Sequence, residues 1–294
     1  MVLQVPTLND STWDFERLFA LWSQANGYFE TVRFDFSQCT FLRPNAVAFL
    51  GGLARLIESR YGTVTFDWDS FTDQAVMTNL QQNGFAGIFG HPSRRWSGNS
   101  IPYREDATED HDDILDYLSD YWLGRGWIQV SQRLRDAIVG KMWEIYTNAF
   151  EHARSDVGVF SCGQHFPGVN ELVLSVVDFG VGIAANVRNF LRSDERAGQL
   201  PAAACLRWAF QPGTSTRPND TIRGNGLDLL REFIRVNHGK LEIYSNNGYV
   251  SIEPHRERFV NRRPHFQGTI FHITLRCDES YYQFANEDDE DLPF

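Results

Sequence analysis

Residues 143–153 read WEIYTNAFEHA, and the polar side chains of Glu144, Asn148 and His152 recur there at every fourth position. Positions four apart drift by only about 40° around an α-helix, so these side chains form one shallow stripe. The apolar residues beside the stripe are spaced for burial, which places the stripe at the rim of a hydrophobic core. Two interpretations stay open for the stripe alone: the edge of a binding pocket, or a partly exposed helix face with ordinary local hydrogen bonds.

The residue types in this stripe suit metal-assisted chemistry. A glutamate can position or deprotonate a water molecule or a hydroxyl group, and an asparagine can hold Mg²⁺ through its amide oxygen. Motifs elsewhere in the chain are needed to decide whether the stripe is used in this way.

A second motif, VVDFGVGIAA at residues 176–185, runs from an apolar strand into Asp178 and then into two glycines. Gly180 and Gly182 would let the backbone approach a ligand closely, because no side chain stands in the way. The spacing to Ala185 also matches the dinucleotide-binding pattern G-x-G-x-x-G/A. That pattern calls for an acidic residue about 20 positions later at the end of a second strand, which the polar, helix-like residues that follow do not supply. A Rossmann site and a simple strand-to-helix turn both stay open.

A third motif, RGNGL at residues 223–227, places another Gly-x-Gly directly before a helix. Backbone N–H groups at a helix start form an anion site when side-chain bulk is absent, and Arg223 would add positive charge. A glycine-rich hinge or cap is the plain alternative. The sequence contains no G-x-x-x-x-G-K-[ST] pattern, which argues against a P-loop NTPase.

The motifs are more specific together than singly. Glu-x-x-x-Asn-x-x-x-His on a helix, Asp-x-Gly-x-Gly-Ile after a strand, Gly-x-Gly-Leu before a helix and Gly-Thr at a last strand occur in that order. This order resembles the GHKL (Bergerat-fold) ATP-binding superfamily of gyrase, Hsp90, histidine kinases and MutL, and especially its anti-sigma-factor kinase branch. The resemblance covers about residues 125–277.

The resemblance implies a site for ATP and Mg²⁺, with Glu144 as the general base and Asn148 as the Mg²⁺ ligand. Asp178 would bind the adenine amino group, with Thr269 near that contact, and residues 211–223 would form the ATP lid. The other implied nucleotide-binding residues are Gly180, Gly182 and Ile183 around the base, and Arg223, Gly224, Asn225, Gly226 and Leu227 around the phosphates.

Two positions depart from the family pattern, because His152 stands where Lys or Arg is frequent and Asp228 stands where Gly often follows Gly-Leu. The only candidate phosphoacceptor ahead of the ATP-binding part is His111, followed by Asp112, and it lacks the Pro and Arg/Lys context of that motif. A conventional sensor histidine kinase is therefore not expected.

The N-terminal part alternates strand and helix patterns, which predicts a small α/β domain over residues 1–90. Its predicted elements are two strands at 31–37 and 63–69 and two helices at 44–61 and 73–85. The segment VRFDFSQCTFLRPNAVAFLGGL resembles a STAS domain, the anti-sigma-antagonist fold, and a generic α/β domain is the alternative. Pro44 and Asn45 stand where such domains carry a phosphorylatable Ser, so we expect a docking or signalling module without a phosphoswitch.

Composition and charge bound the function further. A formal net charge of −11 argues against a general nucleic-acid binder, although residues 255–265 (HRERFVNRRPH) are basic and are expected to form an exposed loop for an acidic partner. The four cysteines lie far apart without a C-x-x-C pair, so reduced thiols are expected rather than a zinc site or disulfide framework. The first ten residues lack signal-peptide features and no apolar run approaches ~18–20 residues, so we expect a cytoplasmic protein without a membrane span.

We therefore expect an α/β fold with two domains, a STAS-like domain over residues 1–90 and a Bergerat α/β sandwich over residues 125–277, whose mixed sheet is covered by helices on one face. Residues 91–124 are expected to be a linker and acidic helical connector, and residues 278–294 an acidic tail. The expected function is a Mg-ATP-dependent switch that controls a protein partner, a function compatible with oligomerisation and slow ATP hydrolysis. A serine/threonine kinase of the anti-sigma-factor type, an ATPase subunit of a bacterial stress or defence assembly and, more remotely, a Rossmann oxidoreductase stay open.

Overall fold

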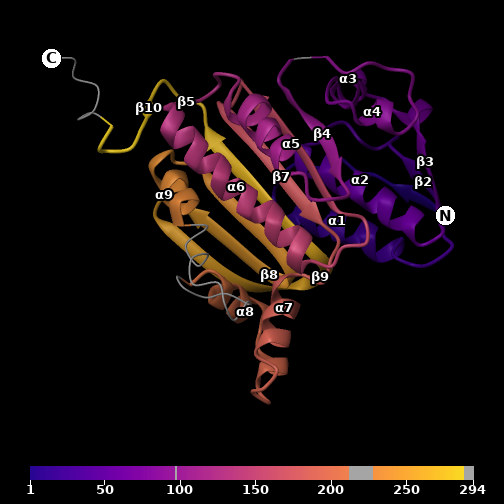
Figure 1. The fold of residues 1–294 in the computed structure, drawn as a ribbon. Coiled ribbons are helices and arrows are strands. Elements are labelled where there is room, and N and C mark those ends of the chain that lie inside the picture. Colours follow the sequence, from indigo (N-terminus) through magenta and orange to yellow (C-terminus); the bar gives the residue numbers. More distant parts are fainter. Residues whose placement is uncertain (97, 212–227, 288–294) are drawn as a thin grey trace.

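The computed structural model describes residues 1–96, 98–211 and 228–287, and Figure 1 shows their arrangement. The N-terminal part contains a three-stranded parallel sheet in the order β1-β2-β3. Its elements are β1 (Val2–Gln4), α1 (Thr12–Gln24), β2 (Thr31–Asp35), α2 (Pro44–Ser59), β3 (Thr63–Asp67), the 3₁₀ helix η1 (Trp68–Ser70), α3 (Gln74–Gln82) and α4 (Phe85–Ile88). The strands and helices predicted for this part are confirmed, and Pro44 occupies the first turn of α2, where its missing N–H costs no helical hydrogen bond.

The larger sheet has five strands in the order β4-β6-β7-β9-β8, and each neighbouring pair is antiparallel. The α/β class is confirmed, but the expected mixed sheet is wrong here, because β9 returns between β7 and β8 and runs opposite to both. The strands outside the N-terminal part are β4 (Ser100–Asp106), β5 (Gln129–Val130), β6 (Val159–Phe166), β7 (Glu171–Asp178), β8 (Lys240–Glu253), β9 (Arg256–Arg276) and β10 (Tyr281–Tyr282), of which β5 and β10 form a separate parallel pair.

Helices cover both faces of the five-stranded sheet (Figure 1). One face packs against α6 (Gln132–His152) and α9 (Asp228–Val236) in a continuous hydrophobic core. The opposite face packs against α1 and α2, whose apolar side chains share a second core with Val177 and Phe179. The expectation of a single covered face is therefore wrong, since the N-terminal helices supply the second layer. The remaining helices are α5 (His111–Asp116), the π-helix η2 (Tyr117–Leu123), α7 (Ile183–Phe190), η3 (Ala197–Gln199) and α8 (Ala202–Ala209).

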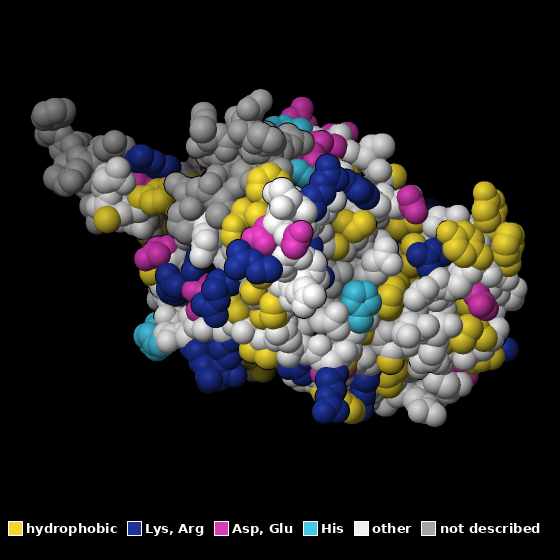
Figure 2. Space-filling view, turned by 90° about the horizontal axis from the view of Figure 1, so that it is seen from below, with side chains coloured by type: hydrophobic (Ala, Val, Ile, Leu, Met, Phe, Trp, Pro, Cys, Tyr) yellow, Lys and Arg dark blue, Asp and Glu magenta, His cyan; other side chains and the backbone are white. Residues whose placement is uncertain are grey.

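The basic segment 255–265 lies almost wholly within β9, so its prediction as a loop is wrong. Its residues 256–261 pair with the second half of β8. Arg256, Arg258 and Arg263 nevertheless have exposed side chains, as expected for a basic surface. Figure 2 shows that Lys and Arg side chains gather on the face of the molecule seen from below, despite the acidic balance of the whole chain.

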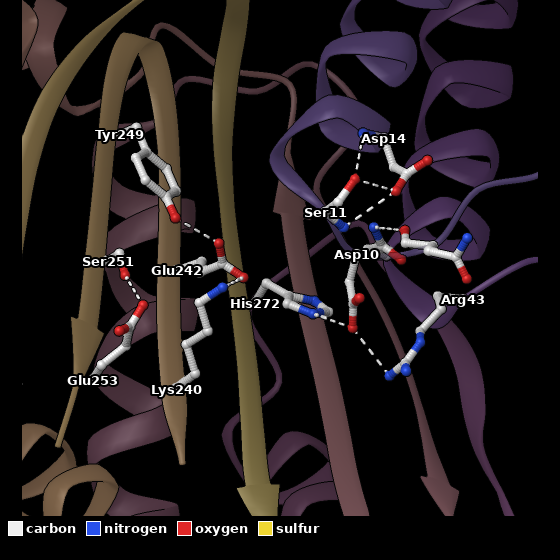
Figure 3. A network of polar contacts seen from close by, with 12 residues as sticks. Asp10, Ser11, Asp14, Arg43, Lys240, Glu242, Tyr249, Ser251, Glu253 and His272 are labelled. Carbon is white, nitrogen blue, oxygen red and sulfur yellow. Dashed lines mark hydrogen bonds and ion pairs between the residues drawn. The ribbon is translucent and has the colours of Figure 1, made fainter. Parts of the chain in front are cut away.

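Strand β8 folds back on itself at Asn246–Gly248, where the sequence predicts a turn. The Tyr249 hydroxyl donates a hydrogen bond to the Glu242 carboxylate at 2.6 Å, although an extended strand would separate residues seven apart by roughly 23 Å. Figure 3 accordingly shows the half that carries Glu242 beside the half that carries Tyr249. The predicted turn is confirmed by this reversal, which brings Asn246 to the end of the sheet.

A buried polar network joins the N-terminal part to the five-stranded sheet (Figure 3). His272 of β9 lies between Ser175 of β7, whose Oγ is 2.8 Å from its Nδ1, and Asp10, whose carboxylate is 3.7 Å from its Nε2. Arg43 then pairs with Asp10 at 3.0 Å and with Glu171 at 3.0 Å. Because segments far apart in sequence contribute these groups, the network fixes how α1 and α2 sit on the sheet.

The predicted linker and tail contain regular structure. Within residues 91–124, β4 forms an edge of the five-stranded sheet, and α5 with η2 provides the expected acidic helical connector. Within residues 278–294, β10 pairs with β5 before the described chain ends at residue 287. The division into two domains stays a prediction. Among the described residues, no helix combines the length and apolar character that crossing a membrane requires.

Candidate functional site

Asp178 is the last residue of β7 and is buried, with 5% of its surface exposed. Its neighbours Val177 and Phe179 point into the core shared with α2, so by strand alternation Asp178 faces the layer that contains α6. It pairs with Thr269 on β9, and its Oδ1 accepts a hydrogen bond from the Gly180 N–H at 2.9 Å. The structure thus brings three of the predicted site residues together at one end of the sheet.

Burial raises the pKa of Asp178 to about 6, while hydrogen bonds from the Gly180 N–H and from Thr269 oppose this shift. A carboxylate offers about four acceptor positions, and a buried one costs free energy unless donors reach it. Strongly perturbed acids of this kind cluster at functional sites, although structural networks also produce them. Asp178 is therefore a candidate acceptor for an N–H or O–H group of a ligand.

The glycine turn after β7 lies against the end of α6. A Cβ atom on Gly180 would come within 2.0 Å of the Ala153 carbonyl oxygen, so only glycine fits there. The Val181 N–H donates to the same oxygen at 2.6 Å, and the Asn186 side chain donates to the His152 carbonyl oxygen at 2.8 Å. These contacts bring the C-terminal end of the α6 stripe to the turn beside Asp178.

On its other side, the glycine turn is held by two residues that the motif analysis did not identify, Ser245 and Asn246. The Ile183 N–H donates to Ser245 Oγ at 2.8 Å. Asn246 donates to the Val181 carbonyl oxygen at 3.0 Å and accepts from the Ala185 N–H at 3.3 Å. Their signal in the sequence is the turn SNNG, which indicates a reversal but not what its side chains bind.

Ser245 also links this turn to Thr269. The two hydroxyl oxygens lie 3.2 Å apart, and Ser245 Oγ is 3.1 Å from the Gly268 carbonyl oxygen, to which it donates. Gly182 adopts φ 83°, and a Cβ there would meet the Asn246 side chain at 2.6 Å. Asp178, Thr269 and the glycine turn are therefore positioned by one continuous set of contacts from β7, β9 and β8.

The polar stripe on α6 is found as predicted, with Ile145 beside it buried. Asn148 is exposed, and Glu144 is half-buried and paired with Lys141 at 2.7 Å. With a rise of about 1.5 Å per residue, Asn148 stands roughly 6 Å and Glu144 roughly 12 Å along the helix from the end that contacts the glycine turn. The stripe thus leads away from Asp178, as required if a ligand lies along α6.

The residues fit a magnesium ion only together with a ligand. Among the described residues, no cluster of three or more His, Cys, Asp or Glu side chains could hold a metal ion. Mg²⁺ is usually bound by one or two protein oxygens together with substrate phosphates and water. The amide oxygen of Asn148 would supply such a protein oxygen, and the ligand would complete the set.

The predicted phosphate-binding residues Arg223, Gly224, Asn225, Gly226 and Leu227 lie outside the described residues, as does most of the predicted lid. An open groove of about 580 Å³ lies elsewhere, between α1 and the outer part of β9, and includes Trp13 and His265. None of the candidate residues above contributes to that groove, so the burial and contacts around Asp178 define the candidate site.

Comparison with models of known protein families and with curated proteins found no match for this chain.

Proposed function

We propose that this chain is an ATP-binding regulatory protein of the GHKL type, a Mg-ATP-dependent conformational switch that controls a protein partner. The observation that carries the proposal is the buried Asp178 carboxylate, bracketed by Thr269 and by a glycine turn in which a Cβ on Gly180 would strike Ala153. A carboxylate in this setting pairs well with an exocyclic amino group, because its two oxygens can accept more hydrogen bonds than Gly180 and Thr269 supply.

The arrangement supports adenine as the ligand group. Adenine offers an amino donor to Asp178, and its flat ring needs close approach to backbone, which Gly180 and Gly182 allow. Thr269 adds a hydroxyl group beside the carboxylate, in contact with Ser245. A ligand seated there would meet the α6 stripe with the part that extends away from the base.

Binding of Mg-phosphate along α6 is the second part of the proposal. Asn148 would hold Mg²⁺, which supplies charge neutralisation to the phosphates when bound. Glu144 would act on a water molecule or hydroxyl group, once it is released from its ion pair with Lys141. The residues 223–227 would complete the phosphate site by the family resemblance.

Control of a partner is proposed because the N-terminal helix α2 packs on β7, the strand that carries Asp178. A change at the glycine turn would be transmitted to α2 through the side chain of Phe179, which lies in their shared core. The presence of Glu144 also favours a second candidate function, phosphoryl transfer to a serine or threonine of the partner. Incubation with radiolabelled ATP and co-purified proteins separates these functions, since a switch alone labels no protein.

The direct test is thermal unfolding of the purified chain with ATP or ADP, with and without Mg²⁺. Ligand bound to the folded state raises the melting temperature, by an amount that grows with the ratio of concentration to Kd. We expect a Mg²⁺-dependent increase for both nucleotides and a smaller effect of Mg²⁺ in Asn148→Ala. An increase with NAD but none with ATP or ADP would overturn the proposal in favour of a dinucleotide site.

A further inference from the structure

Three aromatic side chains form an exposed cluster at the end of the molecule where β2 and β3 begin. Tyr28, Phe29 and Tyr61, here called the aromatic patch, are 66%, 75% and 76% exposed. The rings of Phe29 and Tyr61 stack at 5.7 Å, Tyr28 lies 6.4 Å from Phe29, and the Arg60 guanidinium sits 5.7 Å from the Tyr28 ring centroid. Figure 2 shows hydrophobic side chains standing out at this end.

The backbone of the aromatic patch is in a conformation that aromatic residues rarely adopt. Phe29 has φ 59° and Tyr61 has φ 61°, in the left-handed region where Gly or Asn is ordinarily found. Such positions cost on the order of 1–3 kcal/mol each and persist only where the surroundings fix them. Here the Phe29 N–H donates to the Arg60 carbonyl oxygen at 3.0 Å, which ties the two loops together. Two bulky aromatics are therefore held outward at an energetic cost to the isolated chain.

The patch borders an uncovered face of the N-terminal sheet. Side chains on this face are exposed on all three strands: Val2, Gln4, Thr31, Arg33, Thr63 and Thr65. Parallel sheets are almost always covered on both faces, whereas α1 and α2 cover only the inner face of this one. In addition, β3 is an edge strand, and it begins at Thr63, two positions after Tyr61. The patch and the sheet face thus form one continuous surface that lacks a cover within the described residues.

We propose that this surface joins two copies of the chain in a twofold-symmetric dimer. A twofold interface must complement itself, and an aromatic cluster can pack against its own copy. An aromatic side chain buries about 150–250 Å² when fully covered, so at these exposures the patch offers roughly 400 Å² per copy. Two patches supply about 800 Å², and the adjoining sheet face brings the contact past the ~1,000 Å² expected of a specific interface.

Charge favours a second copy over a charged partner at this surface. The patch and the sheet face carry Glu30, Asp35, Glu58 and Asp67 against Arg33 and Arg60, a formal sum of −2, and Arg33 pairs with Asp67. The whole chain has a formal charge of −11, so two copies repel each other least where the local charge is small. A strongly acidic or basic partner would gain little from a surface with so small a net charge.

Sedimentation of the full chain over a range of concentrations tests the proposal. The informative variants are Phe29→Asn and Tyr61→Asn, because asparagine accepts the left-handed backbone and removes only the ring. Trp13→Gln is the matched control, since Trp13 is 62% exposed on α1 and lies outside the aromatic patch.

We expect the wild-type chain and Trp13→Gln to form dimers with similar Kd. The two asparagine variants should raise the Kd at least about tenfold, the effect of losing one buried aromatic anchor. At concentrations where every chain is monomeric, the two variants should melt at temperatures no lower than that of the wild type. This measurement separates lost association from lost folding. A wild-type chain that stays monomeric to about 100 µM, or variants that dimerise as tightly as the wild type, would overturn the proposal.

Discussion

Gly52 of α2 and Phe179 after β7 touch across the interface between the N-terminal helices and the five-stranded sheet. A Cβ atom on Gly52 would lie 2.2 Å from Phe179 Cε2 and 2.7 Å from Phe160 Cδ2, so the two layers approach as closely as glycine permits. Phe179 stands between Asp178 and Gly180, the two residues at the centre of the candidate site. The position of α2 and the geometry of the site therefore depend on the same side chain.

The first prediction concerns this contact. Gly52→Ala should lower the free energy of unfolding by about 1–3 kcal/mol, because the added methyl group overpacks the core against two aromatic rings. The matched control is Gly140→Ala in α6, where a Cβ would meet nothing within 4 Å. The control should gain about 0.5–1 kcal/mol from helix propensity. Urea unfolding measures both, and equal effects of the two substitutions would contradict the close packing.

The second prediction follows from the raised pKa of Asp178, about 6 against 3.8 for an unperturbed group. Between these values the unfolded chain releases its proton more readily than the folded chain, so this residue lowers the free energy of unfolding as the pH rises. Above pH 6 the buried, ionised carboxylate lowers the free energy of unfolding by on the order of 3 kcal/mol, and below pH 3.8 this effect is absent.

Asp178→Asn removes that ionisation and should be more stable than the wild type at pH 7.5, by up to about 3 kcal/mol. The advantage should shrink towards pH 4. Urea unfolding of both proteins at the two pH values is the measurement, and a variant that is less stable at pH 7.5 would show that the carboxylate is stabilised in its charged form.

The third prediction compares two neighbouring buried hydroxyl groups on α6. Tyr146 Oη lies 2.6 Å from Ser161 Oγ on β6, whereas Thr147 Oγ1 finds no hydrogen-bond partner among the described residues. Tyr146→Phe should therefore cost about 1–2 kcal/mol of unfolding free energy, since it leaves Ser161 without this partner. Thr147→Val should be neutral or stabilising, because it removes a buried hydroxyl group that has no hydrogen-bond partner among the described residues. A lower urea midpoint for Thr147→Val than for Tyr146→Phe would count against this placement of α6.

The fourth prediction concerns Asn246, which holds the glycine turn from β8. Asn246→Gly keeps the left-handed backbone, φ 54°, but removes the contacts to Val181 and Ala185. On the proposed function, nucleotide affinity should fall about tenfold or more through loosening of the turn, while stability falls by only about 1–2 kcal/mol. Binding as tight as that of the wild type would show that the turn needs no support from β8.

Much of the fold could be predicted because each element has a strong local signal. Alternation, helix spacing and terminal Pro or Gly located β2, α2 and β3, and the polar stripe located α6. Helices covering the second face of the five-stranded sheet were not predicted, although the residues of α2 indicated them. Residues Pro44 to Leu50 and Leu53 are all buried, and a helix that is apolar all round must have neighbours on every side.

The candidate site could be predicted only in part. A sequence motif indicates where the backbone requires glycine, but not which residues contact that backbone in the folded chain. The need for glycine at Gly180 and Gly182 was visible, but its cause, contact with Ala153 and Asn246, depends on segments brought together by folding. Ser245 and Asn246 were missed because polar residues in a turn ordinarily serve the turn itself. The extended course of residues 255–265 was likewise hidden by their charge and by Pro264.

Calorimetric titration of Mg-ADP into the wild-type chain and into Asp178→Asn tests whether the buried carboxylate binds the nucleotide. Because the variant is expected to be fully folded at pH 7.5, a loss of binding can be assigned to the carboxylate rather than to unfolding. We predict saturable binding to the wild type and a decrease in affinity of at least about a hundredfold in the variant, the loss typical of an unmatched buried polar contact. Saturable binding of equal affinity to both proteins, or no binding to the wild type, would contradict this prediction.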